Sequence, residues 1–148
     1  MRVALDTSVI VAALVEQHPQ HASAAFWLRT RSAKTRIASA HAFAETWAVL
    51  TSMPLDPPVS GQVALTALTR LERIVRFVPA RQRVYRTAAA RCASLGLRSG
   101  AIYDALHLVT AEFEGADALL TFNERDFARL VAPDGPRILV PSDPPHAP

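Results

Sequence analysis

The stretch VALDTSVIVAAL, Val3 to Leu14, begins as an apolar strand and places a carboxylate, Asp6, where that strand ends. An isolated buried carboxylate is costly to desolvate, so Asp6 needs partners within the fold. One interpretation is that Asp6 caps a helix, because Asp is a favoured N-cap residue and the apolar run SVIVAALV follows soon after it. The other is that acids from distant parts of the chain join Asp6 in a functional site.

The length and composition of the chain predict one domain. The chain has 148 residues, half of them hydrophobic, which suffices for one substantial core and is too short for two ordinary domains. We expect the domain to span residues 1–141 and the proline-rich residues 142–148 to form a frayed tail. The formal charge is +3 and Lys34 is the sole lysine. Arginine suits phosphate and so favours nucleic acid as a partner, although genomic base composition also enriches arginine.

Several classes of protein are disfavoured by the sequence. The single Cys92 excludes an intramolecular disulfide and fits a reducing compartment. No apolar run is long enough to span a bilayer, and the first residues enter a strand-like segment rather than a signal peptide. We therefore expect a cytoplasmic protein with no membrane partner.

Short apolar runs alternate with longer helical segments along the chain. The predicted strands are residues 2–6, 36–39, 74–79, 118–122 and 137–141. The helical segments run from Ser8 to about Arg31, from His41 to Met53 with a second stretch after the loop MPLDPPVSG, from Val84 to Glu114, and briefly after residue 122. This order predicts an α/β fold of three layers, α/β/α, around a mainly parallel five-stranded sheet. Ligands of such sheets bind outside the carboxyl ends of the strands, where Asp6 lies.

The first acid on a predicted helix is Glu45. In SAHAFAETWAVLTSM, residues 39–53, Ser39 is a favourable N-cap, and helical spacing predicts a core stripe formed by Phe43, Trp47 and Leu50. Glu45 lies on the flank of this stripe, beside Ala42 and Val49, rather than among solvated charges.

The second helical acid, Asp104, has a matching position. In SGAIYDALHLVTAEFEG, residues 99–115, Ser99 is the predicted N-cap, Gly115 the predicted end, and the core stripe consists of Ile102, Leu106, Val109 and Phe113. Like Glu45, Asp104 follows the first stripe residue by two positions and has small or apolar flank neighbours.

Taken singly, each of these acids has the alternative of being a solvated or ion-paired side chain. Taken together, Asp6, Glu45 and Asp104 would repel one another unless a cation held them. The candidate ligands are oxygens, and no Cys–His pair has zinc spacing, so Mg²⁺ or Mn²⁺ fits better than zinc.

A fourth contributor is predicted in ADALLTFNERDFARL, residues 116–130. The strand there ends near Thr121 and Asn123, and Asp126 precedes an apolar helical segment. The alternatives are that Asp126 caps the short helix and that Asn123 is a turn residue.

Four segments together resemble a known family. LDTSVIVA, AETWAVL, GAIYDALHLVTAE and ADALLTFNERDF are similar, in order and spacing, to the four motif blocks of PIN-domain ribonucleases, especially the toxins of VapBC toxin–antitoxin pairs. The resemblance covers nearly the whole chain. It implies a parallel sheet flanked by helices and an acidic pocket that holds Mg²⁺ or Mn²⁺ and cleaves single-stranded regions of RNA. It also implies an antitoxin protein as partner, and we expect a homodimer.

The resemblance assigns roles to individual residues. Asp6, Glu45 and Asp104 match the first three acids of the family. Where many relatives have a fourth acid this chain has Asn123, and Asp126 is the candidate for the missing charge. Hydroxyl positions near the metal site of the family are matched by Thr7, Ser8 and Thr121.

The expected chemistry is in-line attack of water on a phosphodiester. Asp6 and Asp104 are the expected metal ligands, while Glu45 binds the metal through water or orients the nucleophile. Arg98 is a candidate phosphate contact, with a solvated side chain as the alternative. We expect His107 at the surface or close to the site, and not as a catalytic base.

Two other functions share part of this pattern. Haloacid-dehalogenase-type phosphatases also begin with a strand that ends in Asp, but they need a second acid two residues later, where this chain has Ser8. The other alternative is a non-catalytic PIN-fold module that binds nucleic acid or protein through its arginines. Three retained acids argue against it, because uncompensated negative charge weakens binding to phosphate.

Overall fold

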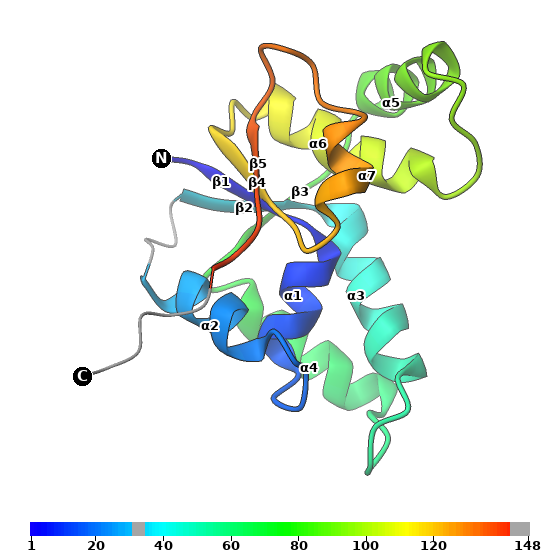
Figure 1. Ribbon diagram of the computed structural model, residues 1–148. Coiled ribbons are helices and arrows are strands. Elements are labelled where there is room, and N and C mark those ends of the chain that lie inside the picture. Colours follow the sequence, from blue (N-terminus) through cyan, green and yellow to red (C-terminus); the bar gives the residue numbers. More distant parts are fainter. Residues whose placement is uncertain (31–34, 143–148) are drawn as a thin grey trace.

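The computed structural model describes residues 1–30 and 35–142, with only the backbone of Thr30. Its sheet has five strands, β1 Val3–Leu5, β2 Arg36–Ser39, β3 Arg76–Val78, β4 Ala118–Leu120 and β5 Arg137–Leu139. The strand order is β3-β2-β1-β4-β5 and every neighbouring pair is parallel (Figure 1). After β1, the chain adds β2 and β3 beyond one edge of β1, and it later adds β4 and β5 beyond the other edge. Asp6 therefore lies where the strand order reverses, the usual position of a ligand site in such sheets.

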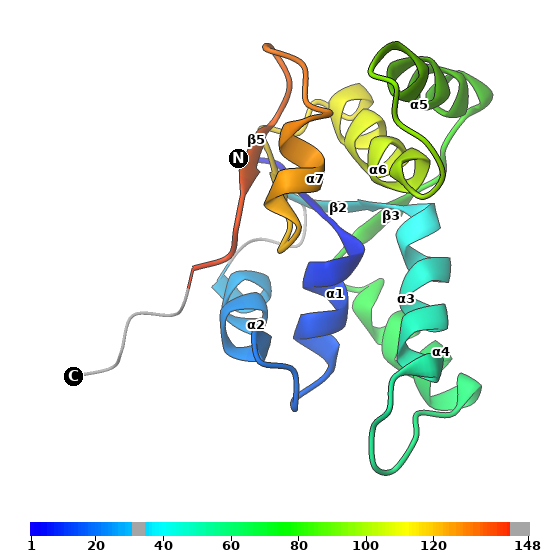
Figure 2. The same ribbon diagram turned by 45° about the vertical axis from the view of Figure 1, so that its right-hand side comes forward.

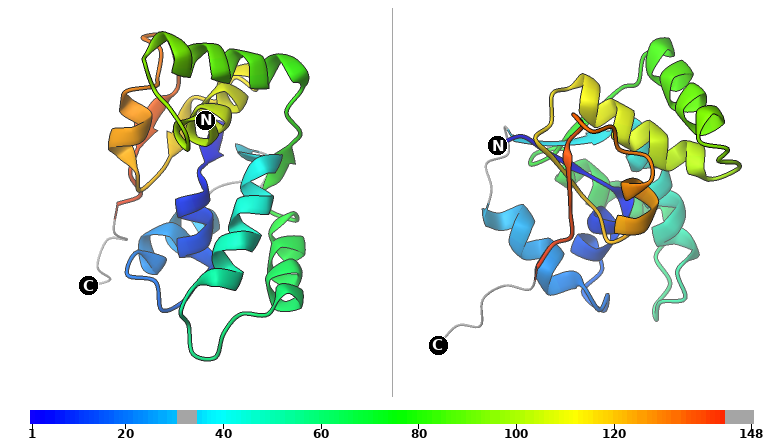
Figure 3. Two further views of the ribbon diagram at one scale, coloured as in Figure 1. Left: turned by 90° about the vertical axis from the view of Figure 1, so that its right-hand side faces the viewer. Right: turned by 45° about the horizontal axis from the view of Figure 1, so that its top comes forward.

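Seven helices cover the two faces of the sheet within the described residues. They are α1 Thr7–Leu14, α2 His21–Thr30, α3 Ala40–Ser52, α4 Gly61–Leu71, α5 Gln82–Ser94, α6 Ala101–Phe113 and α7 Glu124–Ala128. Helices α1 to α4 lie on one side and α5 to α7 on the other (Figures 2 and 3). Alternation along β1 explains the two cores, because Val3 and Leu5 pack with α1 to α4 while Ala4 packs with α5 and α6. The three-layer α/β/α fold predicted from the sequence is confirmed.

Two long helical segments of the sequence prediction are interrupted. The segment from Ser8 to about Arg31 forms α1 and α2, separated by a loop that contains Pro19, which disfavours helical backbone before it. Residues 31–34 lie outside the described part. The segment from Val84 to Glu114 forms α5 and α6, with Gly96 at φ +66° just after the end of α5.

Helix ends agree with the sequence at two of the three positions predicted for α3 and α6. The Ser39 hydroxyl accepts a hydrogen bond from the Ala42 amide at the start of α3, and Gly115 follows the end of α6 with φ +64°. The prediction that Ser99 caps α6 is wrong. Ser99 has a left-handed φ of 53°, and Gly100 is the N-cap, without a side-chain hydrogen bond.

Two aromatic residues of the predicted core stripes are exposed instead. Trp47 is 42% exposed, and its indole lies along Gly61 and donates to the Gly61 carbonyl oxygen over 3.1 Å. Phe113, 44% exposed, lies at the last turn of α6, where the Arg83 guanidinium covers its ring. Helical periodicity predicts which face of each helix is buried. It does not predict which residues of that face extend beyond the neighbouring helices and become exposed.

The C-terminal tail predicted at residues 142–148 lies, from residue 143 onward, outside the described residues. Within the described part, no helix has the length and apolar character needed to cross a membrane.

Candidate active site

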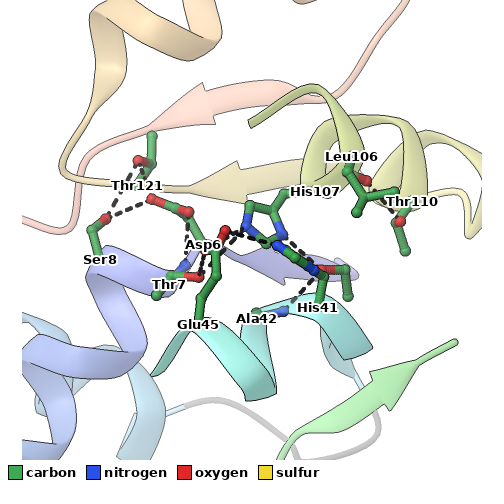
Figure 4. A network of polar contacts seen from close by, with 11 residues as sticks. Asp6, Thr7, Ser8, His41, Ala42, Glu45, Leu106, His107, Thr110 and Thr121 are labelled. Carbon is green, nitrogen blue, oxygen red and sulfur yellow. Dashed lines mark hydrogen bonds and ion pairs between the residues drawn. The ribbon is translucent and has the colours of Figure 1, made fainter. Parts of the chain in front are cut away.

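Asp6 is held rigidly at the carboxyl end of β1. It is only 3% exposed, and its Oδ1 accepts from the Thr7 amide over 2.7 Å. Oδ2 accepts from the hydroxyls of Ser8, over 2.7 Å, and Thr121, over 2.8 Å (Figure 4). Ser8 Oγ also accepts from the Phe122 amide, so the ends of β1 and β4 orient the carboxylate together. Asp6 thus does cap α1, and it also faces the cavity described below.

Glu45 reaches the same region from α3, and both of its oxygens are engaged. Oε2 accepts from Thr7 Oγ1 over 2.7 Å and from His107 Nε2 over 3.1 Å, while Oε1 lies 3.1 Å from His41 Nε2 (Figure 4). Burial alone would raise the pKa of this carboxyl. The hydrogen bond and charge of His107, the Thr7 hydroxyl and the charge of His41 outweigh burial and lower the pKa to about 2. Glu45 is therefore a charged, fixed acceptor at neutral pH.

His107 connects α6 to both β2 and α3. It is buried, with Nδ1 2.6 Å from Ser39 Oγ and Nε2 facing Glu45. Because Nε2 faces a carboxylate, we assign it a proton that it donates to Glu45. The surface alternative considered for His107 is wrong. The signal was in the sequence, since His107 follows Asp104 by three residues and shares its helix face.

Asp104, in the first turn of α6, contrasts with Glu45. Its side chain is partly buried, and it has no hydrogen bond or ion pair within residues 1–30 and 35–142. Burial, and next the negative charge of Asp6, raise the pKa of Asp104 to about 6. The charge of His107 opposes this rise without outweighing it. Asp104 is therefore a carboxylate that no described residue holds in a hydrogen bond or ion pair.

The three acids Asp6, Glu45 and Asp104 line one cavity of about 430 Å³. Of the residues predicted for the site, those that line it are Asp6, Thr7, Ser8, Glu45, Asp104 and Asn123. Thr121 does not line the cavity but donates a hydrogen bond to Asp6. Asp126 does not line the cavity but pairs with Arg129 over 3.2 Å, and Arg98 is exposed on the loop before α6. The sequence analysis did not predict that His41 and His107 both contact Glu45.

The oxygen atoms at the cavity are ligands that suit a divalent cation. Within the described residues, no three His, Cys, Asp or Glu side chains are grouped as a complete metal site. Asp6, Asp104 and the Asn123 amide offer oxygens at one cavity, and Asp104 lacks any other partner. Mg²⁺ is commonly bound through one or two carboxylates and keeps waters and substrate phosphates as its other ligands. The oxygens of Asp6, Asp104 and Asn123 are therefore of the kind that Mg²⁺ or Mn²⁺ binds in proteins.

Comparison with known proteins assigns the family. A model of the PIN domain family matches residues 3–132. The chain belongs to the PIN domain family. It is also 34% identical over 109 residues to Ribonuclease VapC27 of Mycobacterium tuberculosis, a match over 74% of this chain and 76% of the relative. The resemblance of the four sequence segments to VapC-type PIN domains is confirmed.

Solved structures share this PIN fold at low sequence identity. VapC20 of M. tuberculosis, described as a sarcin–ricin loop cleaving toxin, superposes with a TM-score of 0.71 at 19% identity, over 90% of this chain and 99% of that one. VapBC2 from Rickettsia felis, solved with a DNA fragment from its promoter, gives 0.65 at 19% identity, over 95% and 98%. These similarities establish the fold.

The raised pKa of Asp104 predicts a pH-dependent stability of the metal-free PIN domain. A carboxyl whose pKa is raised on folding, here from 3.8 to about 6, contributes stability below its unfolded pKa and loses it as the pH rises through the folded value. Asp104→Asn should remove this penalty. After allowance for solvent screening, we expect the variant to unfold with a free energy higher by on the order of 1 kcal/mol at pH 7, and by only a small fraction of that at pH 4, which lies close to the unfolded pKa.

Urea unfolding in EDTA at both pH values checks this expectation. Glu72→Gln, at an exposed acid after α4, is the control and should change neither value. An Asp104→Asn protein that is less stable than wild type at pH 7 would show that Asp104 is held in an ion pair.

The buried position of His107 predicts that it supports the PIN fold through Glu45 and Ser39. His107→Leu removes the Nε2 donor of Glu45 and the Nδ1 partner of the Ser39 hydroxyl, while Glu45 keeps Thr7 and His41 and Ser39 keeps the Ala42 amide. We expect a loss of about 1–3 kcal/mol in the free energy of unfolding. The matched control is Thr110→Val on the same helix, because the buried Thr110 hydroxyl donates only to the Leu106 carbonyl oxygen of its own helix (Figure 4). Equal losses in the two variants, measured by urea unfolding at pH 7, would refute the role of His107.

Proposed function

We propose that this PIN domain is a metal-dependent endoribonuclease that hydrolyses RNA phosphodiester bonds, and that it is the toxin of a type II toxin–antitoxin pair. The observation that carries the proposal is the pairing of a fixed acid, Asp6, with an unpartnered acid, Asp104, in one open cavity at the carboxyl edge of the sheet. The names of the relatives support it, since one is a ribonuclease and another a sarcin–ricin loop cleaving toxin.

Asp6 and Asp104 are the residues that would hold the cation, with Asn123 as a neutral oxygen beside them. When bound, Mg²⁺ or Mn²⁺ supplies a Lewis acid for the phosphoryl oxygens and lowers the pKa of water. Thr7, His41 and His107 fix Glu45 as a charged acceptor, which suits it to orient the attacking water by accepting a hydrogen bond.

Other predicted residues keep supporting or peripheral roles in the proposal. Ser8 and Thr121 hold the Asp6 carboxylate in place. Asp126 acts only through its charge, which helps to raise the pKa of Asp104. Arg98 remains a candidate contact for a substrate phosphate, because it is exposed on the loop that leads into the helix of Asp104.

The proposed partner is a small antitoxin that covers the cavity in the cytoplasm. An acid without a partner attracts a guanidinium, which compensates the charge of Asp104 without supporting hydrolysis. Solved relatives named as VapBC pairs support such a partner. A homodimer of the chain remains a prediction.

The proposed activity is tested with purified protein and a panel of single-stranded and structured RNAs. We expect cleavage with Mg²⁺ or Mn²⁺, none in EDTA, and none by Asp104→Asn under either condition. If the wild-type protein binds RNA but leaves the whole panel intact with both metals, the non-catalytic binding module replaces the ribonuclease.

A further inference from the structure

We infer that Tyr103, stacked on His41, is a platform for one unpaired base of the RNA substrate beside the acidic cavity. This inference rests on the proposed function, because it gives that site a means of holding single-stranded RNA. It concerns binding of a base and assigns no role to the tyrosine in bond cleavage.

The platform joins two helices that carry acids of the site. Tyr103 immediately precedes Asp104 on α6, and His41 lies one turn before Glu45 on α3. The two rings are stacked, with centroids 4.9 Å apart and planes 7° from parallel. His41 is itself fixed, because its Nε2 lies 3.1 Å from Glu45 Oε1 (Figure 4). The Tyr103 ring is therefore held in one orientation by a group that belongs to the site.

The exposure of Tyr103 leaves aromatic surface for a ligand. One face of its ring lies on His41, yet 48% of the residue is exposed. Unstacked bases of single-stranded RNA are commonly bound on aromatic side chains of this kind. Because the ring is already oriented, little conformational entropy is lost when a base stacks on it.

Exposed aromatic side chains elsewhere in the described residues do not share this position. They are Trp47, Tyr85 and Phe113. Trp47 lies along Gly61, and Arg83 covers Phe113. Tyr85 is as exposed as Tyr103, at 48%, but lies on α5, which contributes no residue to the acidic cavity. Tyr85 is therefore the matched control.

Binding is measured without cleavage by using Asp104→Asn protein and a single-stranded RNA in which 2-aminopurine occupies one position at a time. Stacking quenches the fluorescence of this base, so we expect quenching at one or two positions. Adding Tyr103→Phe should keep the quenching. Adding Tyr103→Leu should remove the quenching and weaken RNA binding about 10- to 100-fold. Adding Tyr85→Leu should change neither the quenching nor the affinity. Quenching that is absent with Asp104→Asn protein, or unchanged by Tyr103→Leu, overturns the inference.

Kinetics on the active protein separate this inference from the proposed function. With an RNA that wild type cleaves, Tyr103→Leu should raise KM with little change in kcat. An abasic nucleotide at the quenched position should raise the KM of wild type. It should raise the KM of Tyr103→Leu no further, because both changes remove the same contact. If the effects of the abasic nucleotide and of Tyr103→Leu on KM add at every position, or if Tyr103→Leu lowers only kcat, the inference fails. RNA cleavage by wild type would still support the proposed function. Absence of all cleavage rejects the proposed function, and the quenching experiment still decides the role of Tyr103.

Discussion

Replacing Asp6 by asparagine is expected to lower kcat/KM for RNA cleavage by at least about 10²- to 10³-fold, the size typical of losing a group that stabilises developing charge. The neutral amide supplies no charge to a cation. Its NH₂ group also cannot accept the hydrogen bonds that Ser8 and Thr121 now donate to Oδ2. The same mismatch should cost about 1–3 kcal/mol of stability, so activity must be measured well below the melting temperature of the variant.

Asp117→Asn is the control for Asp6→Asn. The Asp117 carboxylate accepts from the Arg2 amide over 2.6 Å before the opposite, amino-terminal end of β4 and does not line the acidic cavity. We expect this variant to lose some stability and to cleave RNA like wild type. An Asp6→Asn protein that keeps more than a tenth of wild-type activity, while folded, would contradict the role given to Asp6.

Expression of the chain alone in bacteria is expected to arrest growth, whereas Asp104→Asn should permit it. This variant is the sharper test because the metal-free protein should be at least as stable as wild type, so loss of toxicity cannot be attributed to unfolding. Colony counts after induction, with protein levels matched by immunoblot, give the result. We also expect a short reading frame beside the gene, and co-expression of its product should restore growth to cells that carry the wild-type chain.

Growth arrest by Asp104→Asn at the same protein level would show that toxicity does not depend on the acidic cavity. A neighbouring small protein that binds the chain but leaves growth arrested would remove the support for an antitoxin that covers the site.

The sequence predicted the sheet well because buried parallel strands have a strong local signal. Runs such as VALD and ALLTF are short, apolar and bounded by polar residues, and their order among helices leaves few possible folds. The position of Asp6 follows from the same signal, since a polar residue directly after a buried strand must lie at the carboxyl edge. The helical periodicity of the apolar residues alone was enough to assign Glu45 and Asp104 to a face of their helices.

Contacts between helices could not be predicted in this way. The phase of α6 gives the face on which His107 lies, but its partners Ser39 and Glu45 depend on how α6 crosses the end of β2 and the start of α3. The exposure of Trp47 likewise depends on where α3 extends beyond its neighbours. Asp126 illustrates a further limit, because in the first turn of α7 it pairs locally with Arg129 and not with the acids of the cavity.

The most direct test of the account is a titration of metal-free protein with Mn²⁺, followed by the electron paramagnetic resonance signal of the free ion. We predict saturable binding to wild type, binding weakened at least about tenfold in Asp104→Asn, and unchanged binding in Glu72→Gln. Equal Mn²⁺ binding by wild type and Asp104→Asn, or no binding by wild type, would contradict the claim that Asp6 and Asp104 form the cation site.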